Sequence, residues 1–159
     1  MKIRIIVIGK LKEAYWRAAS DEYLKRLSAY ADFSVLELDE LPTPEKASEI
    51  EKERIKNSEG EKILAKVRSN DFICTLDLGK KEPTSLELSS LLDECLVRSG
   101  SNLTFVIGGS LGLGENIKKR ANASFSLSKL TFTHQMSRVI LLEQLYRSFR
   151  ILHHEPYDK

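Results

Sequence analysis

Two segments in the last third of the chain carry residues suited to holding a ligand. Residues 105–110, Phe-Val-Ile-Gly-Gly-Ser, form an apolar run that ends in glycines, as in a buried strand whose turn lets backbone approach a ligand. Residues 127–138 then enter a helix that carries His134 and Arg138 one turn apart. A histidine can transfer a proton and an arginine can hold an anion such as RNA phosphate. A lone histidine is more often structural, so its type alone leaves the role of His134 open.

The glycine-rich loop at residues 108–114, Gly-Gly-Ser-Leu-Gly-Leu-Gly, does not match the known phosphate-binding patterns. Gly109 and Gly114 have the spacing of half a Walker A motif, but Glu115 and Asn116 stand where Lys and Ser or Thr are needed. The dinucleotide pattern fails because Ile117 occupies the place of its third glycine. A glycine loop with few charges suits an adenine or a ribose better than a triphosphate. The alternative is a turn that binds nothing.

Length and charge restrict the classes of protein to consider. A chain of 159 residues suits one domain, expected to span residues 1–159. The net charge of +2 gives no general attraction to nucleic acid or membrane, so an RNA partner needs a local basic patch. The candidates for such a patch are Lys10, Lys12, Arg17, Lys118, Lys119, Arg120, Arg138 and Arg150.

The cysteines and the N-terminus indicate a cytoplasmic protein without a metal site. Cys74 and Cys95 lie in apolar segments, where cysteine behaves as a small hydrophobic residue. The chain has no CxxC motif and no Cys/His cluster at metal spacing. Arg4 interrupts the apolar N-terminal run, no cleavage site follows it, and no segment approaches the roughly 20 apolar residues of a membrane span.

Strand-like and helix-like patterns alternate along the chain. We expect strands at residues 3–8, 33–38, 71–78, 103–107 and 124–127, and helices at 13–30, 45–67, 85–97, 115–121 and 134–152. A break is expected in the second helix at residues 57–60, Asn-Ser-Glu-Gly. This order predicts an α/β fold with a mostly parallel sheet and helices on both faces. Ligands bind such sheets beyond the carboxyl ends of the strands, so residues 9–10, 76–80, 108–114 and 127–133 should share one edge.

The last helix has its own expected pattern. Its buried stripe is predicted to consist of Met136, Val139, Ile140, Leu142, Tyr146 and Phe149. Glu143 and Arg147 have the spacing of an ion pair on the helix surface, or they meet groups on a second subunit.

Six short motifs occur in order: Ile-Gly-Lys-Leu-Lys at 8–12, Tyr-Leu-Lys-Arg-Leu at 23–27, Gly-Lys at 79–80, Phe-Val-Ile-Gly-Gly-Ser at 105–110, Thr-Phe-Thr-His-Gln-Met-Ser-Arg at 131–138 and Glu-Gln-Leu-Tyr-Arg-Ser-Phe at 143–149. Together they resemble the SPOUT-class RNA methyltransferases. Within that class they are most similar to the ribosomal RNA large subunit methyltransferase H family, which methylates N3 of a pseudouridine in 23S rRNA. Each motif alone is weak, but the ordered set is highly specific.

The resemblance implies a C-terminal trefoil knot, one of the rare exceptions to unknotted connections, and a homodimer. It also implies that S-adenosylmethionine binds among the knotted loops and that 23S rRNA, within the large subunit or the assembled ribosome, is the substrate. The implied cofactor contacts are Leu76, Gly108, Leu127, Ser128, Lys129, Leu130, Thr131 and Phe132.

Methylation at N3 of a uracil-type base requires the loss of a proton, and this defines the catalytic candidates. His134, Tyr157 and the surroundings of the cofactor are candidates to handle the proton, and Arg138 could stabilise negative charge on the base carbonyls or hold phosphate. No single residue is assigned as the base.

The C-terminal tail departs from the family pattern of Tyr-His followed by a basic residue, because Asp158 follows Tyr157. We hypothesise that the tail folds over the site and that Tyr157 stacks on or hydrogen-bonds the target base, with Asp158 peripheral. Asp158 also leaves open a non-catalytic RNA- or ribosome-binding module of the same fold. A third reading, a flavodoxin-like nucleotide-binding protein, predicts a monomer and an unknotted sheet.

Overall fold

The sheet in this computed structural model, which describes residues 1–100 and 102–159, contains parallel pairs throughout. Its strands are β1 (Lys2–Ile8), β2 (Asp32–Leu38), β3 (Phe72–Leu76), β4 (Asn102–Ile107) and β5 (Ala123–Phe125). Their order in the sheet is β2-β1-β4-β3-β5. The parallel sheet is as predicted, and its order differs from the flavodoxin-like order because β4 lies between β1 and β3.

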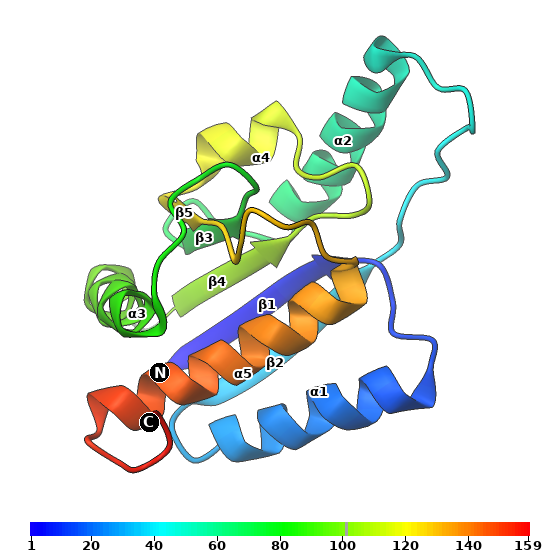
Figure 1. Ribbon diagram of the computed structural model, residues 1–159. Coiled ribbons are helices and arrows are strands. Elements are labelled where there is room, and N and C mark those ends of the chain that lie inside the picture. The colour runs from blue at the N-terminus through cyan, green and yellow to red at the C-terminus, as the bar shows by residue number, and fades with distance from the viewer. Residues whose placement is uncertain (101) are drawn as a thin grey trace.

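Helices cover both faces of the sheet, as predicted (Figure 1). They are α1 (Ala14–Leu27), α2 (Glu49–Leu64), α3 (Ser85–Ser99), α4 (Glu115–Arg120) and α5 (His134–Leu152). Successive strand residues point to opposite faces, and β1 has apolar residues on both. Ile3, Ile5 and Val7 pack in the core that includes residues of α1, α3 and α5. Ile6 and Ile8 pack in the second core, with residues of α2 and α4.

Side-chain caps fix where three helices begin. Ser48, Thr84 and Thr133 each accept a hydrogen bond from a backbone N–H in the first turn of α2, α3 and α5. At α3 the side chain of Glu87 completes a capping box with Thr84. Because Thr133 sets the start of α5, it also sets the position of His134.

The predicted break in the second helix is wrong. Helix α2 runs without interruption from Glu49 to Leu64 and begins four residues later than expected. Gly60 is there because α4 comes close: a Cβ on Gly60 would lie 2.1 Å from Oδ1 of Asn116. The glycine therefore serves helix packing, a role that local sequence does not distinguish from a break.

The buried stripe of α5 is also different from the prediction. Leu142 and Phe149 are buried as expected, together with Leu141 and Leu145, which were not predicted. Met136 is 39% exposed, and Val139, Ile140 and Tyr146 are only half-buried. The predicted set combined residues from two faces of the helix. The centre of the buried face is the row that begins at Arg138.

The two cysteines lie in the core, as predicted, and belong to the layer between the sheet and α3. The neighbouring Cys95 thiol and burial together raise the pKa of Cys74. No helix in the described part of the chain is both long and apolar enough to cross a membrane. The described residues contain no group of three or more His, Cys, Asp or Glu placed to hold a metal ion.

Candidate functional site

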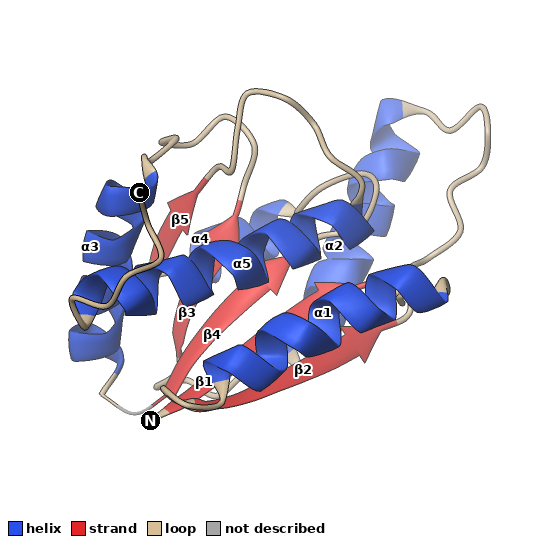
Figure 2. Ribbon diagram, turned by 60° about the horizontal axis from the view of Figure 1, so that its bottom comes forward, coloured by secondary structure: helices blue, strands red, loops and turns tan. Residues whose placement is uncertain are grey.

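A cavity of about 670 Å³ lies where the loops after β3, β4 and β5 meet the start of α5. Figure 2 shows these loops beyond the arrowheads of the strands. The sheet-edge rule therefore brings three of the four expected loops together, since residues 76–78, 107–113, 126–128 and 130–133 contribute to the wall. Residues 9–10 do not line the cavity. The volume is within the usual range for small-molecule and cofactor sites.

Most of the residues expected to contact a cofactor line this cavity. They are Leu76, Gly108, Leu127, Ser128, Leu130, Thr131 and Phe132. Lys129 is exposed and lies outside the lining. The glycine loop contributes residues 108–113, and its Gly112 has a φ of +91°, which favours glycine. Gly114 has a different role, because a Cβ there would lie 2.7 Å from the carbonyl oxygen of Lys56 in α2.

The glycine loop is held from outside by Glu40, which sequence reasoning missed. The backbone N–H of Ser110 donates to Oε1 of Glu40 over 2.8 Å. Burial opposes ionisation of Glu40, but hydrogen bonding from Ser110 outweighs it and lowers the pKa of this carboxyl. Glu59 is buried beside it and accepts from the backbone N–H of Leu41, and burial raises its pKa. The position of Glu40 in the sequence could have indicated this role, because Glu40 follows the carboxyl end of β2.

His134 lines the cavity and packs against the turn that follows β1. A Cβ on Gly9, whose φ is +113°, would lie 2.6 Å from Cε1 of His134. Nδ1 of His134 is buried and has no hydrogen-bond partner among the described residues. Burial lowers the pKa of His134, although Glu40 acts in the opposite direction. The imidazole is therefore predominantly neutral at pH 7 and able to accept a proton.

Arg138 lies beneath His134 and is only 3% exposed. Its Nη1 pairs with Oε2 of Glu37 at 2.7 Å, and its Nη2 donates to the carbonyl oxygen of Gly9 at 3.1 Å. Glu37 also accepts from the backbone N–H of Leu11. These contacts tie the start of α5 to the ends of β1 and β2. Within this chain Arg138 has the contacts of a positioning residue, and its predicted contact with substrate remains a prediction.

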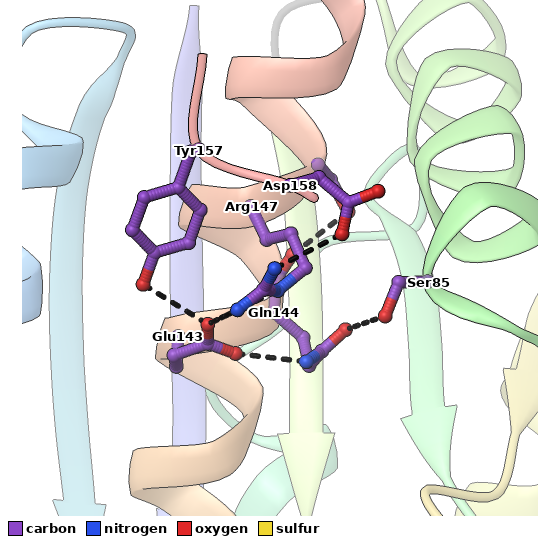
Figure 3. Close-up of polar contacts among 7 residues, drawn as sticks. Ser85, Glu143, Gln144, Arg147, Tyr157 and Asp158 are labelled. Carbon is purple, nitrogen blue, oxygen red and sulfur yellow. Dashed lines mark hydrogen bonds and ion pairs between the residues drawn. The ribbon is translucent and has the colours of Figure 1, made fainter.

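Tyr157 and Asp158 lie on the outer side of α5 (Figure 3). The Tyr157 hydroxyl donates to Glu143 over 3.1 Å, and Arg147 bridges Glu143 at 2.6 Å and Asp158 at 3.0 Å. Burial and the Glu143 carboxylate raise the pKa of Tyr157 to about 12. Glu143 is nine residues beyond His134, or about 13 Å along the helix. Within one chain the structure does not bring Tyr157 to His134.

The basic residues singled out in the sequence do not form one patch. Arg138 is buried against Glu37, and Arg150 pairs with Glu155 in the tail. Arg120 donates instead to the carbonyl oxygens of Arg68 and Asp71, at the other end of the strands.

Comparison with known proteins places the chain in a family. The family model described as "Predicted SPOUT methyltransferase" matches residues 1–158. Two proteins of Clostridium botulinum, strains Eklund 17B and Alaska E43, are 54% and 53% identical over the full length of both chains. A Clostridium perfringens SM101 protein is 49% identical, again over all of both chains. The first two are named ribosomal RNA large subunit methyltransferase H, and the third ribosomal RNA large subunit methyltransferase H 1. The chain therefore belongs to the SPOUT methyltransferase family.

Proposed function

We propose that this protein methylates N3 of a pseudouridine in 23S rRNA, using S-adenosylmethionine, as a cytoplasmic homodimer. Its substrate is the large ribosomal subunit or the assembled ribosome. Full-length relatives named ribosomal RNA large subunit methyltransferase H support the reaction class. The observation that carries the proposal is the cavity in which three strand-end loops meet a half-buried, neutral His134.

The cavity has the character that S-adenosylmethionine requires. Apolar side chains of Leu76, Ile107 and Leu127 offer surface for an adenine, and the loop of residues 108–113 offers backbone groups. Ser126 and Ser128 add hydroxyl groups, and Ser126 is already fixed by a hydrogen bond to the carbonyl of Ser128. When bound, the cofactor supplies a methyl group that its sulfonium centre has already activated. The main task of the protein is then to align the two reactants and to free the lone pair on N3.

The opposite pKa shifts of His134 and Tyr157 give these two candidates different roles in handling the proton. His134 is neutral near pH 7 and can accept the N3 proton. Tyr157, with a pKa of about 12, keeps its proton near neutral pH and can donate a hydrogen bond but does not act as a base. A contact between Tyr157 and the target base requires the tail to move or a second subunit to supply it. Arg138 holds the helix start that carries His134.

The knot is part of the proposal. The backbone N–H of Ser126 donates to the carbonyl of Lys81 over 2.8 Å, and that of Asp77 donates to Phe125 over 2.9 Å. The loop after β3 and the segment that leads to α5 are therefore in direct contact. Such contact is what passage of the C-terminal segment through this loop requires.

Three measurements test the proposal. Calorimetry should detect S-adenosylmethionine binding at micromolar concentration, and mass spectrometry of 23S rRNA should find a methyl-pseudouridine that is missing from cells lacking the protein. Purified large subunits or ribosomes from those cells should regain the methyl group with the wild-type protein, and His134→Ala should reduce the rate strongly. The exposed Lys129→Ala serves as a matched substitution outside the cavity lining. Failure to bind the cofactor at high micromolar concentration would favour the non-catalytic module.

A further inference from the structure

A second, smaller hollow lies at the opposite end of the strands from the cavity. Its volume is about 220 Å³, and it is lined by residues at the amino ends of β1 and β4. Figure 2 shows these strand ends close to the N-terminus. We call it the basic hollow. The residues that line it are Lys2, Arg4, Ser34, Lys66, Arg68, Asp71, Asn102, Leu103 and Thr104. It is separate from the proposed cofactor site, since Arg4 precedes Gly9 by five extended residues, or about 16 Å.

Positive charge dominates the basic hollow. Four of its lining residues are cationic, and among the described lining residues Asp71 alone is acidic. Oδ2 of Asp71 is already occupied by the backbone N–H of Arg68 at 2.8 Å and by Nη2 of Arg4 at 3.5 Å. Lys2, Lys66 and Arg68 are exposed, and the described residues offer their side chains no ion pair. The cations thus remain available to an anion from solution.

The wall of the basic hollow is fixed in place. Nη2 of Arg120 donates to the carbonyl oxygens of Arg68 at 3.0 Å and Asp71 at 2.8 Å. The Asp71 side chain holds the same turn from the other side through its hydrogen bond with the Arg68 backbone. This turn therefore carries Lys66 and Arg68 at a defined distance from Lys2 and Arg4. Because the backbone of this turn is already fixed, only the side chains of Lys66 and Arg68 must become ordered when they bind an anion.

Size and chemistry select the class of ligand. A volume of about 220 Å³ is below the usual range for small-molecule sites and suits a phosphate group rather than a whole nucleotide. Lysine, arginine, serine and asparagine side chains are the usual partners of nucleic-acid phosphates, and Ser34 and Asn102 supply the neutral ones. We propose that the basic hollow binds the phosphate backbone of the rRNA substrate, as an anchor remote from the methylated base. This inference rests on the proposed function for the identity of the RNA.

An anchor of this kind explains how a chain with a net charge of +2 holds a highly charged substrate. The basic residues near the cavity are partly neutralised by acidic neighbours, as Lys10 is by Asp39 and Lys118 by Asp77. A ribosomal subunit extends far beyond 16 Å, so one enzyme can contact it at both edges of the sheet. Phosphate contacts of this type position the protein and carry no sequence information.

The double variant Lys66→Gln/Arg68→Gln tests the anchor. The control is Lys46→Gln/Arg54→Gln, which removes the same charge from two exposed residues outside the hollow. Removing a cation that binds phosphate weakens RNA affinity and makes it less dependent on salt. At physiological salt the Lys66/Arg68 variant should raise KM for large subunits about tenfold or more and reduce the slope of log K against log salt by about 1.5. Both kcat and S-adenosylmethionine affinity should match those of the wild type and the control.

The alternative outcomes are distinct. An unchanged KM, or an equal rise in the control, overturns the anchor, because charge at the hollow would then have no special role. A titration with inorganic phosphate at millimolar concentration, followed by NMR, tests whether the basic hollow binds a free anion instead. If phosphate saturates the hollow while the double variant keeps the wild-type affinity for subunits, the RNA anchor is also overturned. Co-sedimentation with large subunits measures binding through the basic hollow without requiring methyl transfer. A wild type that binds subunits through the hollow but transfers no methyl group therefore separates failure of the proposed function from failure of the anchor. Circular dichroism confirms that each variant is folded.

Discussion

His134 combines a fixed position with a ring nitrogen that stays free for chemistry. Gly9 allows the ring to lie directly on the backbone after β1, and Thr133 caps the helix that carries it. Nδ1 is buried without a partner in the described part of the chain, so burial disfavours the charged imidazolium. A neutral imidazole at the cavity wall is the protonation state that a proton acceptor needs.

The titration of His134 should show this directly. Burial lowers its pKa and Arg138 does the same, whereas Glu40, Glu13 and Glu37 raise it. We expect an NMR midpoint below the ordinary value of about 6.5. Glu40→Gln should lower the midpoint further, because the amide keeps an acceptor for Ser110 but removes the charge. If His134 is the base, kcat/KM loses activity only as the pH falls through this lowered value. A midpoint at or above 6.5 would contradict the burial argument.

Gly9→Ala should be far more harmful than Gly79→Ala. Both glycines have positive φ, at +113° and +88°, so both substitutions strain the backbone. Only the Cβ at position 9 collides with His134, since none of the described residues has an atom within 4 Å of a Cβ at position 79. Chemical denaturation should give a loss of about 1 kcal/mol for Gly79→Ala and about 2–3 kcal/mol for Gly9→Ala. Methylation should fall sharply only in Gly9→Ala. Equal losses of stability and activity would show that the His134 contact is unimportant.

At the scale of elements, α2 and α4 form a close pair that frames one side of the cavity. Nδ2 of Asn116 donates to the carbonyl oxygen of Asn57, and Oδ1 accepts from the backbone N–H of Ile117. The Asn116 side chain therefore lies against α2 at the point where Gly60 leaves room for it. Lys56 of α2 and Lys118 of α4 both reach the cavity wall. The packing of this pair thus sets one boundary of the site.

Gly60→Ala tests whether packing outweighs helix propensity. In an exposed helix interior this change stabilises by about 1 kcal/mol. Here the new Cβ would lie 2.1 Å from Oδ1 of Asn116. The Asn116 side chain must therefore move away and break its hydrogen bonds with Asn57 and Ile117. We expect a net loss of about 1–2 kcal/mol in the free energy of unfolding. In a double-mutant cycle, Asn116→Ala should remove most of this loss. A more stable single variant would show that α4 moves freely.

At the scale of the whole molecule, the parallel direction of the strands places the two candidate RNA contacts at opposite strand ends. The cavity lies beyond the carboxyl ends of β3 and β4, and the basic hollow lies at the amino ends of β1 and β4. The tail joins neither within one chain, because Glu143 and Arg147 hold it on the outer side of α5 (Figure 3). The arrangement leaves α5 as the element that connects His134 to the tail.

Substitutions in the tail separate its structural role from its predicted catalytic role. Tyr157→Phe removes one hydrogen bond to Glu143 and should cost about 1 kcal/mol. Asp158→Asn weakens an ion pair in which Asp158 is 45% exposed and should cost less than about 1 kcal/mol. If Tyr157 contacts the target base, Tyr157→Phe and Tyr157→Ala should slow ribosome methylation and Asp158→Asn should not. Methylation at the wild-type rate in both Tyr157 variants would exclude Tyr157 from the reaction.

The homodimer proposed for this chain is tested by its mass in solution. Light scattering should give about 36 kDa for two copies of the 18.1 kDa chain. A mass of one chain at micromolar concentration would contradict the proposed dimer.

The sequence by itself determined the features that depend on local chemistry. Apolar periodicity and turn residues predicted the parallel α/β architecture, the bounds of α5, and the edge at which the cavity loops meet. The ordered motifs indicated the family that the comparisons confirm. These features follow from residues near one another in the chain, whose spacing fixes periodicity and turn geometry.

Only the tertiary structure decided which distant groups meet. Arg138 pairs with Glu37, 101 residues away, and the Glu40 carboxylate holds Ser110 across 70 residues. Gly60 also depends on a distant partner. Local sequence predicts a helix break there, and only the packing of Asn116 against it shows why a glycine is needed. Such contacts depend on strand order and on helix packing, and many pairings are compatible with the same local pattern. The sequence therefore indicated where the site is, and the fold decided which side chains face it and which support it from behind.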